Sequence, residues 1–223
     1  MSPSKATAAS TVEAAVDAFA NGDPVLVHDF ADREGEVDMV YPARSVTPQD
    51  VATMRNDAGG LVCVALGPAV ADAFELPFLA DEIDHPAAQT EHLGYDERSS
   101  FSLSVNHRET YTGITDDDRA LTISKLGDAA AAPESTDFAT SFRAPGHVHV
   151  LRAARDGLEE RKGHTEMGIA LAEAADREPA AVVCEMLDDA TGEALSKSDA
   201  RAYAERYGIP FVEGTDLVAA LGD

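Results

Sequence analysis

The sequence predicts an α/β (α+β) fold, a single domain in which a mixed sheet is flanked by helices. Apolar runs of strand length alternate along the chain with segments of helical period, an order typical of layered folds. The chain has 223 residues, of which 44% are hydrophobic, and this suits one packed core. No linker divides it, so we expect one domain over residues 11–223 and a flexible tail over residues 1–10.

The first half of the chain begins with a helix. Residues 11–20 carry apolar side chains at helical spacing, and Gly22 follows as a stop signal. Thr47 is an N-cap with proline after it, so a second helix is expected from there to near Gly59. The other elements expected are strands at 24–30, 39–43 and 61–66, a short helix at 68–75, and an extended loop at 77–99.

The second half continues the alternation. Residues 101–107 alternate like a half-exposed strand. Thr115 precedes three aspartates that suit a helix N-terminus, and Thr115 with Asp118 fits the reciprocal capping pattern. The other elements expected are strands at 147–153, 181–187 and 209–213 and helices at 165–175, 199–207 and 215–221.

The charge of the chain excludes some classes of partner. There are 41 acidic and 17 basic residues, a formal net charge of -24, whereas nucleic acid and anionic membranes are bound by basic surface. Only four of the basic residues are lysines. Acid excess with scarce lysine favours a protein from a halophilic organism, in which salt screens self-repulsion. An ordinary acidic protein is the alternative.

The cysteines and the N-terminus indicate an intracellular protein. Cys63 and Cys184 lie in apolar runs, which predicts buried thiols and no disulfide framework. The N-terminus lacks the continuous apolar core of a signal peptide. No apolar run approaches the about 18 residues of a membrane span. We therefore expect a cytoplasmic protein that acts without a membrane or a nucleic acid.

An acidic segment is the first candidate for chemistry. Four carboxylates and Arg33 lie within the seven residues 32–38. In an extended chain Glu34, Glu36 and Asp38 would point to the same side. Three carboxylates held together repel unless a divalent cation or a substrate proton offsets them. The embedded arginine and the apolar flanks argue against the alternative, a solvated acidic loop.

A cationic segment is the second candidate. Residues 138–155 contain no acid but include Arg143 and His147, and Arg161 and Lys162 follow soon after. A local cationic pocket in an acidic protein suggests an anionic substrate, with phosphate the simplest. The alternative is that the strand at 147–153 is merely an edge strand.

Two further residues stand out beside these segments. His164 follows Gly163 at a helix start, where free N–H groups suit an anion and the imidazole is a candidate metal ligand or acid–base group. A capping or surface histidine is the alternative. Glu185 lies in an otherwise apolar strand, where it is either paired, protonated or metal-associated, or simply on the wet face.

Five segments, in order, resemble the 3,4-dihydroxy-2-butanone 4-phosphate synthase family. The resemblance implies that family's fold and a carbon–carbon lyase that converts D-ribulose 5-phosphate to L-3,4-dihydroxy-2-butanone 4-phosphate and formate in riboflavin biosynthesis. It also implies Mg²⁺ or Mn²⁺ as cofactor and a homodimer with the active site near the subunit interface. The segments are DREGEVDM (32–39), TGITDDDRALTI (112–123), RAPGHVHVLRA (143–153), RKGHTEMGIALAEAA (161–175) and VVCEM (182–186).

The same resemblance implies roles for particular residues. Glu34 and His164 match the metal ligands, and His147 and Glu185 match positions essential for catalysis. Asp38 and Glu36 are further catalytic candidates. The candidates for substrate binding are Arg33, Glu34, Asp38, Thr112, Arg161, Lys162, Gly163, His164, Thr165 and Glu185.

Two other functions remain open at this point. One is another metal-dependent enzyme on a sugar phosphate, an isomerase or aldolase, which would release no formate. The other is a non-catalytic α/β module that binds nucleotide or RNA, which the net charge disfavours.

The net charge generates a testable prediction. We expect the melting temperature to rise between about 0.1 and 3 M KCl, because molar salt shortens the Debye length to about 3 Å and weakens acid–acid repulsion. Thermal melting followed by circular dichroism checks this. A flat or falling melting temperature would contradict salt adaptation and leave the enzymatic interpretation untouched.

Overall fold

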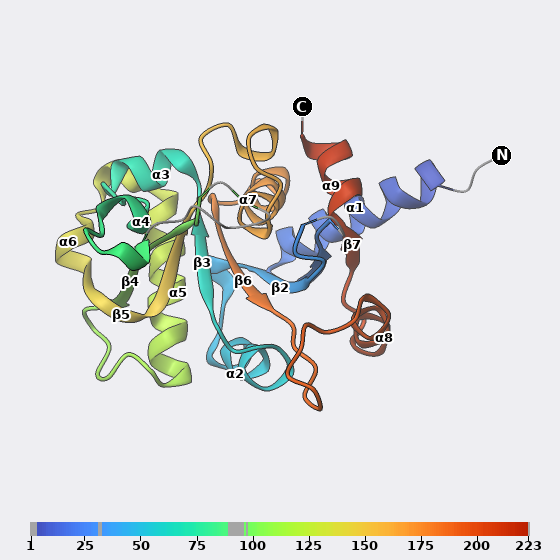
Figure 1. The fold of residues 1–223 in the computed structure, drawn as a ribbon, viewed down its shortest axis with the longest axis horizontal. Coiled ribbons are helices and arrows are strands. Elements are labelled where there is room, and N and C mark those ends of the chain that lie inside the picture. The colour runs from blue at the N-terminus through green and yellow to red at the C-terminus, as the bar shows by residue number, and fades with distance from the viewer. Residues whose placement is uncertain (1–3, 31–32, 89–95, 97, 223) are drawn as a thin grey trace.

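Seven strands form one mixed sheet at the centre of the fold (Figure 1). The computed structural model describes residues 4–30, 33–88, 96 and 98–222. The strands are β1 (Val25–His28), β2 (Val37–Pro42), β3 (Cys63–Leu66), β4 (Phe101–His107), β5 (Phe142–Arg152), β6 (Ala180–Glu185) and β7 (Phe211–Glu213). Their spatial order is β4-β5-β3-β6-β2-β1-β7. The β1–β7 and β3–β5 pairs are parallel and the others are antiparallel.

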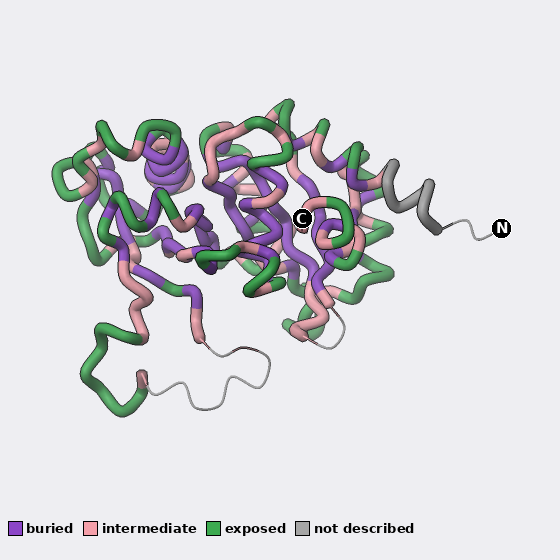
Figure 2. The backbone as a smooth tube through the Cα atoms, turned by 90° about the horizontal axis from the view of Figure 1, so that it is seen from above, coloured by how far each residue is buried: buried purple, intermediate pink, exposed green. Residues whose placement is uncertain are grey.

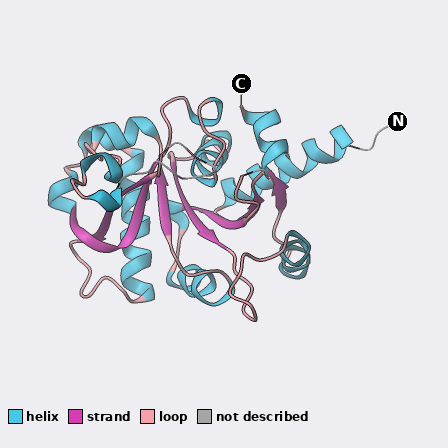
Figure 3. Ribbon diagram, in the orientation of Figure 1, coloured by secondary structure: helices cyan, strands magenta, loops and turns pink. Residues whose placement is uncertain are grey.

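Helices cover both faces of the sheet (Figure 3). They are α1 (Ser4–Asn21), α2 (Pro48–Asp57), α3 (Pro68–Ala73), α4 (Leu79–Glu82), α5 (Asp116–Ala131), α6 (Phe138–Ser141), α7 (His164–Ala174), α8 (Lys197–Tyr207) and α9 (Gly214–Leu221). Side chains of α1, α7 and α9 pack on one face, and those of α2, α3, α5 and α8 pack on the other. Among the described residues, no helix combines the length and the apolar character needed to cross a membrane.

The strands alternate between the two cores, as a central sheet requires. In β6, Val182 and Cys184 belong to the core beneath α5, whereas Ala181 and Val183 belong to the core beneath α7. Figure 2 shows this continuous buried interior, with exposed residues on the outer helices and loops. Both cysteines are buried and free, as predicted.

The predicted fold class is confirmed, and most predicted elements are present. Strand β5 is longer than expected and lies inside the sheet, with β4 at the edge, so the edge-strand alternative for residues 147–153 is wrong. The first helix begins at Ser4 rather than at residue 11. The flexible tail over residues 1–10 stays a prediction, as does the domain over 11–223. The expected loop at 77–99 contains α4 and a 3₁₀ turn, and its residues 89–95 and 97 lie outside the described residues.

The two predicted helix caps differ in outcome. Thr47 and Asp50 form the full reciprocal cap. Thr115 accepts the N–H of Asp118 at 3.1 Å, but the reciprocal half is wrong. The Asp118 carboxylate instead accepts the backbone N–H groups of Tyr111, Thr112 and Gly113 at 3.2, 3.0 and 2.7 Å. Three donors outcompete one, and the aspartate thereby anchors the turn that carries Thr112.

Glu213 ties the last strand to its neighbours. Its carboxylate accepts hydrogen bonds from Lys197 Nζ at 2.8 Å and from the Arg201 guanidinium, and it lies 3.0 Å from His28 Nδ1. Burial raises the pKa of Glu213, but the hydrogen bonds from Lys197 and Arg201 outweigh it, so the net pKa lies below the ordinary value.

We predict that Glu213→Gln destabilises the protein at neutral pH by about 1–2 kcal/mol. A carboxylate whose pKa is lower in the folded state contributes stability above its unfolded pKa of about 4.3 and loses it as the pH falls through the folded value. The deficit of the variant should therefore shrink between about pH 5 and pH 3. Urea denaturation checks this, with the exposed Glu205→Gln as control. If the stability deficit of Glu213→Gln stays constant down to about pH 3, the prediction is wrong.

Candidate active site

The pairing of β2 with β6 places two carboxylates opposite each other at one end of the sheet. Asp38 is the register partner of Glu185. They alternate with the residues of the core beneath α5 and share the face of Val40 and Val183, which pack beneath α7. Because α7 starts at His164, its N-terminus adds an imidazole to the same place.

His164 is buried, and its ring has a fixed orientation. Its Nε2 lies 3.1 Å from the Val27 carbonyl oxygen, so Nε2–H donates and Nδ1 is left without a proton in the neutral ring. Nδ1 lies 3.4 Å from Asp38 Oδ1 and 3.8 Å from Glu34 Oε2. A histidine that donates its outer N–H to a carbonyl and directs the other nitrogen at carboxylates has the arrangement of a metal ligand. The alternative of a surface or capping histidine is wrong.

The acidic segment folds differently from the expectation. The chain turns at residues 33–35, with Gly35 at φ 70°, and of the three acids only Asp38 lies on a strand. The prediction that Glu34, Glu36 and Asp38 point to the same side of an extended chain is therefore wrong. Asp29 makes the turn: its carboxylate accepts the N–H groups of Glu34 at 3.3 Å and Glu36 at 3.0 Å. This turn still directs Glu34 toward His164. Asp32 lies outside the described residues.

The electrostatics of this cluster favour retention of a proton. Burial raises the pKa of Asp38 to about 8, with repulsion from Glu185 adding to it and attraction to His164 opposing it. Burial lowers the pKa of His164, but Asp38 and Glu34 outweigh it and raise the pKa to about 9. Asp38 Oδ1 is buried with no hydrogen-bond partner among the described residues. A divalent cation would supply the charge that the proton supplies here.

The donor set fits such a cation. Ligand atoms of Asp29, Glu34 and His164 all lie within 4.8 Å of one another. Carboxylate oxygens with one imidazole suit a hard divalent ion such as Mg²⁺ or Mn²⁺. Both Asp29 oxygens already accept backbone N–H groups, which fixes the turn. Glu34 and His164 are therefore the stronger candidates for the metal ligands.

Two arginines converge beside the acids. Arg33 Nη2 and Arg161 Nε lie 2.8 and 2.5 Å from the same oxygen of Asp96. Arg161 Nη1 also donates to the buried Glu166 at 2.6 Å. A Cβ on Gly163 would come within 2.3 Å of Arg161 Nη1, so the glycine lets this guanidinium fold across the start of α7. The two guanidinium groups form an anion-binding site, which the Asp96 carboxylate occupies in this structure.

These groups surround a cavity of about 240 Å³. Glu36 is half-buried beside the other carboxylates. Burial and the charges of Glu34 and Glu185 raise its pKa. Lys162 and Gly163 form the turn into α7 without lining the cavity. The predicted residues that line it are Arg33, Glu34, Asp38, Arg161, His164, Thr165 and Glu185.

His147 and Thr112 are not among the residues that line this cavity. They lie near each other around Asn106, which contacts the His147 ring and the Thr112 carbonyl group. His147 lies on β5 four residues before Leu151, a cavity-lining residue, or about 13 Å along an extended strand. Within one chain they therefore form a second group.

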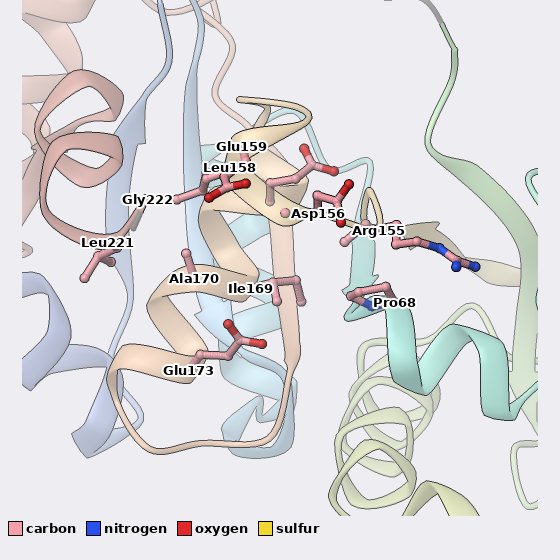
Figure 4. Close-up of a pocket in the computed structure, with 13 residues that line it drawn as sticks. Pro68, Arg155, Asp156, Leu158, Glu159, Ile169, Ala170, Glu173, Leu221 and Gly222 are labelled. Atoms are coloured by element: carbon pink, nitrogen blue, oxygen red, sulfur yellow. The ribbon is translucent and has the colours of Figure 1, made fainter.

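A second cavity of about 290 Å³ lies on the outer side of α7 (Figure 4). Asp156, Glu159 and Glu173 line it together with apolar residues such as Ile169. It contains none of the site residues predicted from the sequence and shares no lining residue with the first cavity, although Glu166, which lines it, accepts a hydrogen bond from Arg161. The cavity at the ends of β2 and β6 is the candidate active site.

The sequence interpretation missed residues 98–101, which line the cavity, and three acidic residues that hold the side chains of the site in place. Asp29 directly follows strand β1 and precedes the acidic segment, a position that could have marked it as the residue that closes the turn. Glu166 stands three residues after Gly163 and accepts its N–H at 3.3 Å, which is the capping spacing. Asp96 comes from a stretch without sequence period, and no signal identified it.

Comparisons with known proteins point to one family. A model of the 3,4-dihydroxy-2-butanone 4-phosphate synthase family matches residues 13–220. The chain is 49% identical over 218 residues to the protein of that name from Archaeoglobus fulgidus, with 92% of each chain covered. It is 46% identical over 222 residues to that of Methanosarcina mazei, with 94% of this chain and 90% of the relative covered.

Solved structures show the same fold. A 3,4-dihydroxy-2-butanone 4-phosphate synthase in complex with two magnesium ions superposes with a TM-score of 0.81 at 32% identity, over 94% of this chain and 95% of the other. The enzyme of Candida albicans gives a TM-score of 0.78 at 30% identity, over 94% and 96%.

We predict that His164→Ala and Glu34→Ala each weaken Mn²⁺ binding by at least about 10–100-fold, the range seen even for residues that only support a ligand. Binding to the parent should tighten as the pH rises, because the cation displaces a proton. Electron paramagnetic resonance of free Mn²⁺ measures both. The control is His149→Ala, whose ring packs against Phe101 outside the cluster. If His164→Ala binds Mn²⁺ like the parent, the metal site is wrong.

Proposed function

Because the chain belongs to the 3,4-dihydroxy-2-butanone 4-phosphate synthase family, we propose that the cavity at the ends of β2 and β6 is where it acts on its substrate. The chain is a carbon–carbon lyase of riboflavin biosynthesis, and it converts D-ribulose 5-phosphate to L-3,4-dihydroxy-2-butanone 4-phosphate and formate. The comparisons support neither an unrelated sugar-phosphate enzyme nor a nucleotide-binding or RNA-binding module.

The observation that carries the proposed site is the buried Asp38, whose Oδ1 has no hydrogen-bond partner among the described residues, with the half-buried Glu185 opposite it and His164 beside it. A buried carboxylate without such a partner lowers the stability of the fold unless a bound ligand compensates its charge. A sugar phosphate on a divalent cation suits both groups of side chains: the cation adds positive charge beside the acids, and the phosphate can take the place of the Asp96 carboxylate between the arginines.

Glu34 and His164 would hold Mg²⁺ or Mn²⁺, with Nδ1 of the imidazole as the nitrogen donor. The bound cation supplies electrostatic stabilisation for negative charge that develops on neighbouring substrate oxygens. Val27 keeps the ring in the required tautomer through its carbonyl oxygen.

Asp38 and Glu185 would move protons on the bound sugar. A group with a pKa of about 8 carries a proton at neutral pH and can also release it, which is the property of a general acid–base catalyst. Glu185 faces it across the β2–β6 pair and offers a second carboxylate. Glu36 has a pKa raised by burial and by the charge of Glu34, and it is the third candidate.

Arg33, Arg161 and Thr165 would hold the phosphate. Both guanidinium groups already converge on one carboxylate oxygen, that of Asp96, and a phosphate offers the same geometry with more charge. Helix α7 has eleven residues and begins directly after Lys162 and Gly163. The backbone N–H groups of its first turn favour an anion beside the two arginines.

A homodimer would bring His147 and Thr112 to the substrate. Neither lines the cavity of its own chain. The turn that carries Thr112 exposes two large apolar side chains, Tyr111 at 92% and Ile114 at 53%. A second copy that covers this surface would bury them and place one chain's His147 group against the other chain's cavity.

The experiment is formate release from ribulose 5-phosphate by the parent and by Glu185→Gln. We expect the variant to fold and to bind Mn²⁺ and substrate, yet to turn over about 10²–10⁴-fold more slowly, because a general acid–base group is missing. The matched control is Glu173→Gln on the exposed side of α7. Full activity of Glu185→Gln would contradict its catalytic role, and absence of formate from the parent would contradict the function.

A further inference from the structure

Strand β5 bulges away from the regular ladder where it passes His147. Val105 of β4 pairs with Val148, but the next residue, Asn106, pairs with Arg143. Four residues of β5, 144–147, therefore stand opposite a single step of β4. Bulges of this kind redirect a side chain and are common beside active sites.

The bulge lies unusually close to β4. A Cβ on Gly146 would come within 2.0 Å of the Val105 carbonyl carbon, so only glycine allows this approach. The Gly146 N–H donates to the Ser104 hydroxyl at 3.3 Å. The backbone groups of the bulge thus find side-chain partners on β4 in place of the ladder that they have left.

Asn106 completes this replacement, and the contact fixes the orientation of its amide. The backbone N–H of His147 donates to Asn106 Oδ1 at 2.8 Å, so the oxygen must face the backbone. Asn106 Nδ2 then lies 3.1 Å from His147 Nδ1 and 3.5 Å from the Thr112 carbonyl oxygen, and Oδ1 lies 3.3 Å from the same ring nitrogen, farther than Nδ2 does. Both of these neighbours are acceptors for an amide N–H when Nδ1 carries no proton.

The surroundings hold the amide in place. Asn106 is only 3% exposed, and a Cβ on Gly113 would lie 2.0 Å from its Nδ2. The turn that contains Gly113 is in turn held by Asp118. His147 itself is exposed, so its ring presents one edge to Asn106 and has the other edge free for a ligand.

We propose that Asn106 is a positioning residue that keeps Nδ1 of His147 unprotonated and thereby presents Nε2–H to the substrate. The inference rests on the proposed function, which makes His147 catalytic. A neutral imidazole in this tautomer donates a hydrogen bond to a substrate oxygen rather than accepting a proton from it. An aspartate at this position could not donate to Nδ1 and would favour the opposite tautomer.

The direct test is ¹⁵N nuclear magnetic resonance of the histidine ring nitrogens at about pH 8.5, where an ordinary imidazole is neutral. We expect Nε2 of His147 to carry the proton in the parent, with the signal identified by its loss in His147→Ala. In Asn106→Asp the proton should move to Nδ1. The control is Ser104→Ala, which touches the same bulge through Gly146 and should leave the tautomer unchanged.

Kinetics test whether Asn106 acts through His147. Asn106→Ala should lower kcat on the order of tenfold with KM within about twofold, and the same change should cost nothing further in His147→Ala. A proton on Nδ1 in the parent, or an unchanged tautomer in Asn106→Asp, overturns the positioning by Asn106. A fully active His147→Ala overturns instead the catalytic role that the proposed function assigns to His147.

Discussion

The site depends on one electrostatic constraint, the burial of Asp38 beside the half-buried Glu185 and Glu34 at the paired ends of β2 and β6. The register of these strands sets Asp38 against Glu185 beneath α7, and the turn held by Asp29 adds Glu34. Burial of uncompensated charge is costly. His164 and a retained proton offset part of it, which leaves a place suited to a divalent cation.

The other parts of the site follow from this constraint. Arg33 and Arg161 bring positive charge to the same cavity. Both contact Asp96, Arg161 also contacts Glu166, and Arg33 Nη1 lies 3.5 Å from Glu34 and 3.6 Å from Asp29. Acidic and basic side chains thus meet in one cavity of about 240 Å³, where the acids with His164 suit a cation and the arginines suit a phosphate. The packing of α7 on the sheet keeps these acids close together, and functional sites commonly hold such arrangements at a cost in stability.

Much of this could be predicted from the sequence. Apolar periods and caps such as Thr47 located the elements, and the order of five segments indicated the family. Residues whose role depends on contacts between distant elements could not be found in this way: Asp96 and Asn106 carry no local pattern. The capping role expected of Asp118 was also wrong, because a turn close by offered its carboxylate more donors than the helix start did.

The central claim is that the buried acids hold a proton where a cation belongs, and proton release on Mg²⁺ binding tests it most directly. Isothermal titration calorimetry in buffers of different ionisation enthalpy measures this release. The account predicts about one proton released for the first ion bound near neutral pH, and less in Asp38→Asn. Binding of Mg²⁺ with no proton release, or equal release by Asp38→Asn, would contradict it.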